Sequence, residues 1–185
     1  MNFLNVSSEL VSNDNFFEKL SNNTKKNQKY NTVIDTNLIK EVVKKWETRE
    51  LNFKNAWEAM IDLNVSYPRI VFNQLVIETG NLKSSLCKNN NNLFGMKMPN
   101  RRFTWAFKKT RQNNSFYKHW IYSVLDIFEY QLTRKNKDYR SHLISSRFAK
   151  SKSYGLRMSK LDLTKKYNLN LNYVSDLNIY RIKKT

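Results

Sequence analysis

The sequence predicts a mainly α-helical domain that carries a small β-hairpin. Several segments place their apolar residues at the 3.6-residue period of a helix. One segment, residues 97–118, instead sets aromatic residues between basic and turn-forming residues, a pattern that suits a hairpin or flap. The chain has 185 residues, of which 40% are hydrophobic and 14% aromatic. This length and composition suit a single domain with one hydrophobic core.

The chain divides into three parts by composition. Residues 1–34 are rich in Asn, Ser and Lys, and we expect them to form a flexible segment. The ordered domain is predicted over residues 35–161, and residues 162–185 are a basic C-terminal extension with some helical potential. Asp35 or Thr36 can cap the first helix. The apolar positions of that helix are Leu38, Ile39, Val42, Val43 and Trp46.

Further helices follow along the chain. A second helix carries Phe53, Ala56, Trp57, Met60 and Ile61. We predict the third from Pro68 to Glu78, because proline suits the first helical position and Gly80 suits the C-terminal cap. The body of this helix is almost wholly apolar, which indicates a buried central helix. A short helix and a loop are expected over residues 81–96, and helices over residues 121–132 and 139–148.

The charge of the chain predicts an anionic partner. The formal net charge is +18, from 33 Lys and Arg against 15 Asp and Glu. Such a surplus suits binding to nucleic acid, a membrane or envelope surface, or an acidic polymer. The alternative is a basic surface that only keeps the chain soluble. Between Glu78 and Asp126 the sequence holds nine Lys or Arg residues and no Asp or Glu.

Several kinds of site and segment are not expected. Cys87 is the one cysteine, so an intrachain disulfide and a cysteine-based metal site are excluded, and we expect it to be a small buried side chain. We expect no metal and no other cofactor. The first ten residues do not resemble a signal peptide, and no window is apolar enough to span a bilayer. We therefore expect synthesis in a host cytoplasm without a signal peptide.

Glu78 is the first candidate for chemistry. It is a single carboxylate at the end of an apolar helix, and a long cationic segment follows it. If that helix end is buried, desolvation favours the protonated carboxyl that a general acid requires. The alternative is an ordinary helix-terminal acid that offsets the positive charge.

The residues around Glu78 form a motif. The chain reads Gln74, Glu78-Thr79-Gly80, Lys83-Ser84 and then NNLFGMK over residues 91–97. Here the sequence resembles the glucosaminidase family (glycoside hydrolase family 73), which cleaves peptidoglycan, as a phage or bacterial member. The similarity covers about residues 52–161. It continues through Arg102-Phe103-Thr104, Phe116-Tyr117, Trp120, Asp126 and the segment 148–154.

The resemblance implies a lysozyme-like fold and an endo-β-N-acetylglucosaminidase activity. That activity cuts the β-1,4 bond after N-acetylglucosamine, with Glu78 as the general acid. Tyr117 matches the active-site tyrosine of the family. Asparagine side chains can bind hydroxyl and N-acetyl groups, and aromatic rings can stack on sugars, although Phe94 and Trp120 also suit a core. The candidate substrate-binding residues are Asn91, Asn92, Phe94, Gly95, Trp105 and Trp120.

The chain departs from the family in its flap. Glycosidases commonly pair two carboxylates, and many family members have an acid in the flap, but residues 98–116 contain none. Asp126 is a possible second carboxylate, although we interpret its main role as structural. Three alternatives stay open at this point. The 2-acetamido group of the substrate can act as the nucleophile, Asp126 or Glu129 can approach the site, or the domain can bind glycan and cut slowly.

The resemblance also implies partners and a setting. Peptidoglycan is the expected substrate, anionic envelope polymers and virion proteins are further candidate partners, and no specific nucleic acid is expected. A small basic enzyme of this kind is typical of a phage lysin or a virion-associated lytic enzyme that acts on the cell wall. The main alternative is a non-catalytic glycan-binding or structural virion protein on the same scaffold. Nucleic-acid binding is a second alternative, from the charge.

Overall fold

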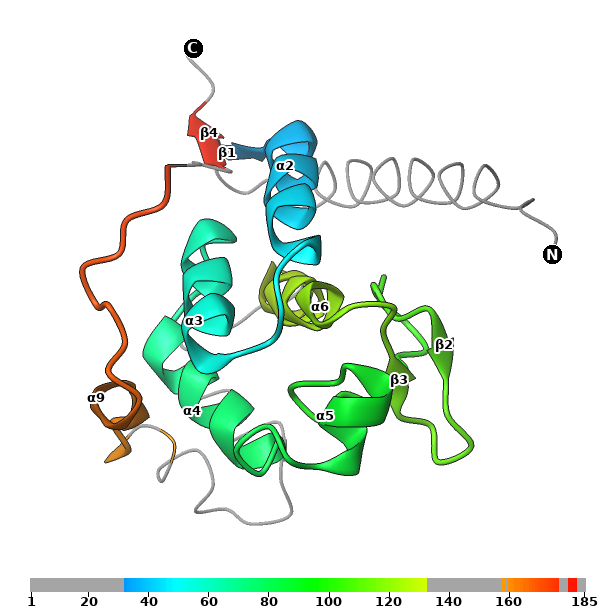
Figure 1. Ribbon diagram of the computed structural model, residues 1–185. Helices are drawn as coiled ribbons and strands as arrows, with labels where there is room; N and C mark the ends of the chain where they lie inside the picture. Colours follow the sequence, from blue (N-terminus) through cyan, green and yellow to red (C-terminus); the bar gives the residue numbers. More distant parts are fainter. Residues whose placement is uncertain (1–31, 133–157, 159, 177–179, 183–185) are drawn as a thin grey trace, which may run out of the picture.

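The protein is a mainly α-helical, lysozyme-like domain with a small hairpin, as predicted (Figure 1). The structure, a computed structural model, describes residues 32–132, 158, 160–176 and 180–182. Its elements in chain order are β1 (Thr32–Ile34), α2 (Thr36–Glu47), α3 (Phe53–Asp62), α4 (Pro68–Glu78), α5 (Ser85–Asn90), β2 (Lys108–Lys109), β3 (Ser115–Phe116), α6 (Trp120–Leu132), α9 (Leu163–Lys166) and β4 (Tyr180–Ile182).

Local capping sets where the first two helices begin. The carboxylate of Asp35 accepts hydrogen bonds from the backbone N–H groups of Asn37 at 2.9 Å and Leu38 at 3.3 Å, so Asp35 is the N-cap of α2. The side chain of Asn52 accepts from the N–H of Asn55 at 2.8 Å and caps α3 in the same way. The periodic apolar positions of α2 are buried as predicted, at Ile39, Val42, Val43 and Trp46.

Helix α4 has the predicted bounds and is largely buried. Residues 71–76 are all buried, and α4 contacts α3 on one side and α9 on another. The C-cap residue is Thr79, whose hydroxyl donates to the carbonyl of Leu75 at 2.7 Å. Gly80 follows the cap with φ +54°, a left-handed conformation that favours glycine. The helix therefore ends at a fixed point, and Glu78 is its last residue.

The core lies where α6 packs against α2 and α3. In Figure 1, α6 is surrounded by the other helices, and its residues 120–129 are buried except Tyr122. Aromatic side chains pack between α2 and α6: the ring centres of Trp46 and Trp120 lie 6.1 Å apart, and the rings meet edge to face. A buried α6 matters for the site, because it carries Asp126, Glu129 and Tyr130.

The hairpin is smaller than predicted. Its strands have two residues each, with Lys108 opposite Phe116 and Lys109 opposite Ser115. Phe103, Thr104 and Trp105 lie within the range predicted as a hairpin or flap, but they form no strand. The backbone N–H of Trp105 donates to the side chain of Asp126 at 3.2 Å and makes no strand pairing, so this segment lies against α6.

The two ends of the described chain meet in a pairing that the sequence did not reveal. β1 and β4 are antiparallel, with Thr32 opposite Ile182 and Ile34 opposite Tyr180. A strand thus precedes Asp35, at which the domain was predicted to begin. The helical potential after residue 162 is realised as the four residues of α9. The helix expected over residues 139–148 lies outside the described residues.

A single asparagine on α4 binds the C-terminal part of the chain. The Asn73 side-chain amide donates to the carbonyls of Met158 and Leu161 at 2.9 and 2.8 Å, and its oxygen accepts from the N–H of Leu163 at 3.2 Å. Asn73 therefore contacts residues on both sides of the domain boundary predicted at residue 161, a boundary that stays a prediction. In the described part of the chain, no helix is long and apolar enough to cross a membrane.

Candidate active site

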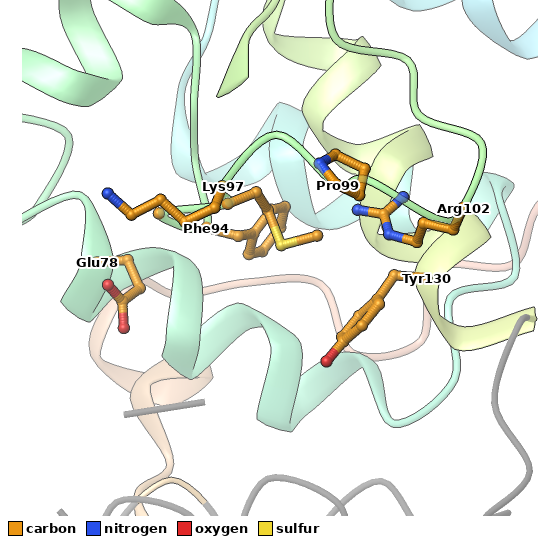
Figure 2. Close-up of a pocket in the computed structure, with 8 residues that line it drawn as sticks. Glu78, Phe94, Lys97, Pro99, Arg102 and Tyr130 are labelled. Carbon is orange, nitrogen blue, oxygen red and sulfur yellow. The ribbon is translucent and has the colours of Figure 1, made fainter. Parts of the chain in front are cut away.

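A pocket of about 300 Å³ lies between the end of α4 and the segment that follows α5. Figure 2 shows Glu78 at one end of this pocket and Arg102 with Tyr130 at the other. The pocket brings together three of the predicted site residues, Glu78, Phe94 and Gly95. Its complete lining is Glu78, Phe94, Gly95, Met96, Lys97, Pro99, Arg102 and Tyr130.

Glu78 reaches the pocket because glycine lies opposite its carboxylate. A Cβ atom placed on Gly95 would lie 3.1 Å from Oε2 of Glu78. Gly95 also has φ +62°, so both its backbone conformation and the space beside it favour glycine. The Glu78 side chain is half-buried, so it is less enclosed than the sequence predicted. Among the lining residues that the structure describes, Glu78 is the only carboxylate.

Asn91 and Asn92 shape the loop that carries Phe94 and Gly95. Asn91 ends α5 in the left-handed conformation, and its amide donates to the backbone carbonyl of Tyr117 at 3.0 Å. Asn92 is 1% exposed. Its amide donates to the carbonyls of Met96 and Ser115, both at 2.9 Å, while its oxygen accepts from the N–H of Met96 at 3.0 Å. Neither asparagine lines the pocket.

The carboxylate of Asp126 is a buried hub beside the pocket. Its Oδ1 accepts from Arg102 Nη1 at 2.8 Å and from the N–H of Trp105 at 3.2 Å. Its Oδ2 accepts from Arg102 Nη2 at 3.0 Å and from the hydroxyl of Tyr117 at 2.7 Å. Asp126 is fully buried, and both of its oxygens are occupied. This geometry supports the structural interpretation of Asp126, because a two-pronged guanidinium contact holds the carboxylate in place.

Tyr117 lies behind the pocket and does not line it. The side chain is fully buried. Burial raises the pKa of Tyr117 well above its ordinary value, and the neighbouring Asp126 carboxylate adds to the shift. The phenol therefore remains protonated and donates to Asp126. In this position Tyr117 orients Asp126, which in turn holds Arg102 at the pocket.

The two predicted tryptophans belong to the core. Trp105 is 5% exposed, and its ring stacks on Tyr122 with centroids 6.2 Å apart. Trp120 is 2% exposed, and its indole N–H donates to the carbonyl of Arg49 at 2.9 Å. Neither ring lines the pocket, whereas Phe94, also fully buried, does. Cys87 is buried as predicted, and burial raises the pKa of its thiol.

Lys97, Arg102 and Tyr130 line the pocket but were not assigned to the site from the sequence. The Arg102 guanidinium lies 5.3 Å from the centre of the Tyr130 ring. Tyr130 follows Asp126 by four residues, so both lie on one face of α6. The four-residue spacing was the sequence signal that could have assigned Tyr130 to the site. It is informative only once Arg102 is known to bind Asp126. In the described ranges, no group of three or more His, Cys, Asp or Glu is arranged to hold a metal ion.

Glu129 is a second buried carboxyl near the hub. It is 2% exposed, and its Oε2 has no hydrogen-bond partner among the described residues. Burial raises the pKa of Glu129 to about 7; the nearby Arg102 guanidinium opposes this shift, and the Asp126 carboxylate adds to it. Glu129 therefore carries its proton in the folded protein at mildly acidic pH.

We expect Glu129 to make the stability of the protein depend on pH. The folded pKa is about 7, against an ordinary value of 4.5. Stability from this group is therefore fully present below about pH 4.5 and is lost as the pH rises to about 7. The loss is about 3 kcal/mol in the free energy of unfolding. Urea unfolding of Glu129→Gln at pH 5 and pH 7 should show a smaller decrease than the native protein.

The exposed Glu41 on α2 supplies the matched control for this measurement. Glu41→Gln should keep the native pH dependence. An unchanged pH dependence in Glu129→Gln would show that Glu129 is not the responsible group.

Comparison with known proteins identifies the family. A family model described as mannosyl-glycoprotein endo-beta-N-acetylglucosaminidase, named Glucosaminidase, matches residues 53–178. No curated protein and no solved structure matches the chain. The matched range is more than half of the 185 residues and contains the whole pocket. The chain therefore belongs to the glucosaminidase family, a peptidoglycan-type family of glycoside hydrolases.

Proposed function

We propose that the protein hydrolyses the β-1,4 bond after N-acetylglucosamine in peptidoglycan, with Glu78 as the general acid. The observation that carries this proposal is the position of Glu78 in the pocket, with the backbone of Gly95 against its carboxylate. Phe94 and Gly95 are proposed to contact the sugar, since both line the same pocket. Family membership supports a polysaccharide substrate of this class.

The first step requires a proton at the glycosidic oxygen. A sugar alkoxide is a poor leaving group, so the carboxyl of Glu78 donates its proton to that oxygen as the bond from C1 breaks. The lining around Glu78 includes the apolar side chains of Phe94, Met96 and Pro99. An apolar lining with a few polar groups is typical of pockets that bind small ligands.

The substrate itself is proposed to supply the second catalytic group. The oxygen of the 2-acetamido group attacks C1 as the leaving oxygen takes the proton, which forms a cyclic intermediate. Water then attacks C1 and breaks its bond to the acetamido oxygen, which restores the acetamido group. The carboxylate of Glu78 accepts a proton from that water, so the enzyme returns to its starting state. The occupied oxygens of Asp126 favour this scheme over a second carboxylate at that position.

Tyr117 and Asp126 are proposed to be positioning residues. They act through Arg102, which lines the pocket and is ion-paired with Asp126 at 2.8 Å. Asn91 and Asn92 act through the loop that presents Gly95 to Glu78. Trp105 and Trp120 support the same wall from the core.

The proposed setting is the bacterial cell wall, with the protein as a phage lysin or a virion-associated lytic enzyme. A non-catalytic glycan-binding protein on the same scaffold is the second candidate. The single carboxylate among the described lining residues favours that candidate if the substrate does not assist.

The products of digestion test the bond that is cut. Purified peptidoglycan treated with the protein should yield muropeptides with reducing-end N-acetylglucosamine in the β configuration, because attack by the acetamido group followed by water inverts C1 twice. Mass spectrometry after borohydride reduction identifies the sugar, and proton NMR of fresh digests gives the anomer. Reducing N-acetylmuramic acid would assign a different bond, an initial α product would exclude substrate assistance, and no product at any pH would favour the non-catalytic candidate.

Glu78→Gln tests the general acid. The amide keeps the shape of the side chain but has no acidic proton, so turnover should fall by at least about 100-fold while glycan binding remains. Release of reducing ends measures turnover, and sedimentation with insoluble peptidoglycan measures binding. Native turnover in this variant would exclude Glu78 from the chemistry.

Two glycines allow a matched test of the space beside Glu78. Gly95 and Gly80 both have positive φ, but a Cβ on Gly80 meets no atom within 4 Å, while one on Gly95 meets Oε2 of Glu78. Alanine at either position should lower the free energy of unfolding by about 1 to 2 kcal/mol. Gly95→Ala alone should also reduce turnover, by about tenfold or more, because it displaces the carboxylate. Equal turnover in the two folded variants would argue against this contact.

A further inference from the structure

The β2–β3 hairpin presents an exposed surface that combines aromatic rings with lysines. We call Phe107, Lys108, Phe116 and Lys118 the hairpin surface. Phe107 is 57% exposed, which is unusual for a phenylalanine and is not needed for the core. Its backbone N–H donates to the carbonyl of Phe116 at 2.8 Å, so both rings belong to the same paired segment.

A lysine ammonium lies over each phenylalanine ring of the hairpin surface. The Lys118 ammonium lies 4.7 Å from the centre of the Phe107 ring, and the Lys108 ammonium lies 4.7 Å from that of Phe116. These are cation–π distances. Both ammonium groups therefore lie over rings of one short paired segment, with Lys108 on β2 and Lys118 just after β3.

The chain segment that contains the hairpin surface has charge of one sign. Residues 79–125 contain nine Lys or Arg residues and no Asp or Glu. One of the nine, Arg102, is ion-paired with Asp126 of α6. Lys109 and Arg111 are exposed on the hairpin itself. Positive charges grouped in this way attract a polyanion and raise its rate of encounter.

Lys97 joins the hairpin to the pocket. It lines the pocket, and its ammonium donates to the carbonyl of Gln112 at 3.1 Å and also to the side chain of Asn114. Residues 112 and 114 belong to the turn of the hairpin. The hairpin is thus attached directly to the pocket wall, as the neighbouring positions of α5, β2 and β3 in Figure 1 also indicate.

We propose that the hairpin surface binds a phosphodiester polymer attached to the wall glycan, beside the glycan strand that occupies the pocket. This rests on the proposed function, because the pocket must hold the glycan for the hairpin to meet a polymer joined to it. The phosphates pair with the ammonium groups of Lys108 and Lys118. The carbon atoms of the polyol between phosphates lie on the rings of Phe107 and Phe116.

A polymer is favoured over a single anion because one short hairpin holds two lysine–ring pairs. One phosphate meets one ammonium, whereas a chain with repeated charges engages both and gains affinity from the linkage. Such binding weakens as salt rises, because charges on an exposed surface are screened over about 8 Å at physiological ionic strength. The proposed effect on catalysis is a lower KM for polymer-bearing walls with an unchanged kcat.

The test compares walls with and without their phosphodiester polymer. The probes are purified cell walls that carry teichoic acid, before and after extraction with hydrofluoric acid, which cleaves phosphodiesters. We expect the native full-length protein to bind extracted walls about tenfold more weakly in a sedimentation assay, and the difference to shrink in high salt. A variant that combines Phe107→Ala, Lys108→Gln and Lys118→Gln should bind both kinds of wall equally weakly.

The control variant combines Lys44→Gln, Lys54→Gln and Val174→Ala. It removes the same charge and another exposed apolar side chain, since Val174 is 79% exposed, but all three lie outside the hairpin and the pocket. This variant should keep most of the preference for untreated walls. Equal losses in the two variants would show that total charge decides binding and would overturn the proposal.

A competition experiment with soluble polyanions tests which anionic partner the hairpin surface prefers. Soluble teichoic acid should displace the protein from untreated walls at lower phosphate concentration than duplex DNA or lipopolysaccharide. Stronger displacement by either of these would overturn the proposal and assign the surface to that partner. Sedimentation needs no turnover, so a protein that binds with the expected preference but releases no reducing ends would contradict the proposed hydrolysis and leave the hairpin assignment standing.

Discussion

The pocket depends on one buried carboxylate. Asp126 accepts four hydrogen bonds, and through them it holds the guanidinium of Arg102, the backbone of Trp105 and the hydroxyl of Tyr117 against α6. The segment that contains Arg102 has little regular structure of its own, so this wall of the pocket is placed by a side chain and not by a strand. Removing one partner of such a buried ion pair costs about 3 to 5 kcal/mol, because the remaining charge is left uncompensated. The position of this wall of the pocket therefore depends on Asp126 and its partners.

Two buried carboxyl groups on α6 lie near a single guanidinium. Asp126 and Glu129 are three positions apart, and Arg102 interacts with both. One guanidinium cannot fully compensate two buried carboxylates, and the protein resolves this by keeping a proton on Glu129. A buried carboxyl with a pKa near neutrality next to a pocket is typical of functional sites, but such shifts also arise in structural networks. Here the proton on Glu129 allows Arg102 to remain paired with Asp126.

Much of the fold followed from local patterns in the sequence. The bounds of α4, the N-cap of α2 and most of the buried apolar positions of α2, α3 and α4 were predicted, because capping and helical periodicity involve residues within a few positions of one another. The hairpin was predicted in the right place but too long. Residues 103–105 fell within the range predicted as a hairpin or flap, whereas the backbone of Trp105 is bound by Asp126, 21 positions away. Several expected sugar-binding residues, Asn92 and Trp120 among them, are buried and hold the loop or the core.

The sequence by itself determined that Glu78 ends an apolar helix, that the NNLFGMK motif follows it at residues 91–97, and that residues 79–125 are cationic and free of acids. These properties are local or compositional, so they do not depend on how the chain closes. Only the tertiary structure decided that Gly95 lies against Glu78, that Arg102 and Tyr130 complete the pocket, and that β1 pairs with β4. Contacts of this kind join residues far apart in the chain. Their partners are selected by packing around α6, and no local pattern encodes that packing.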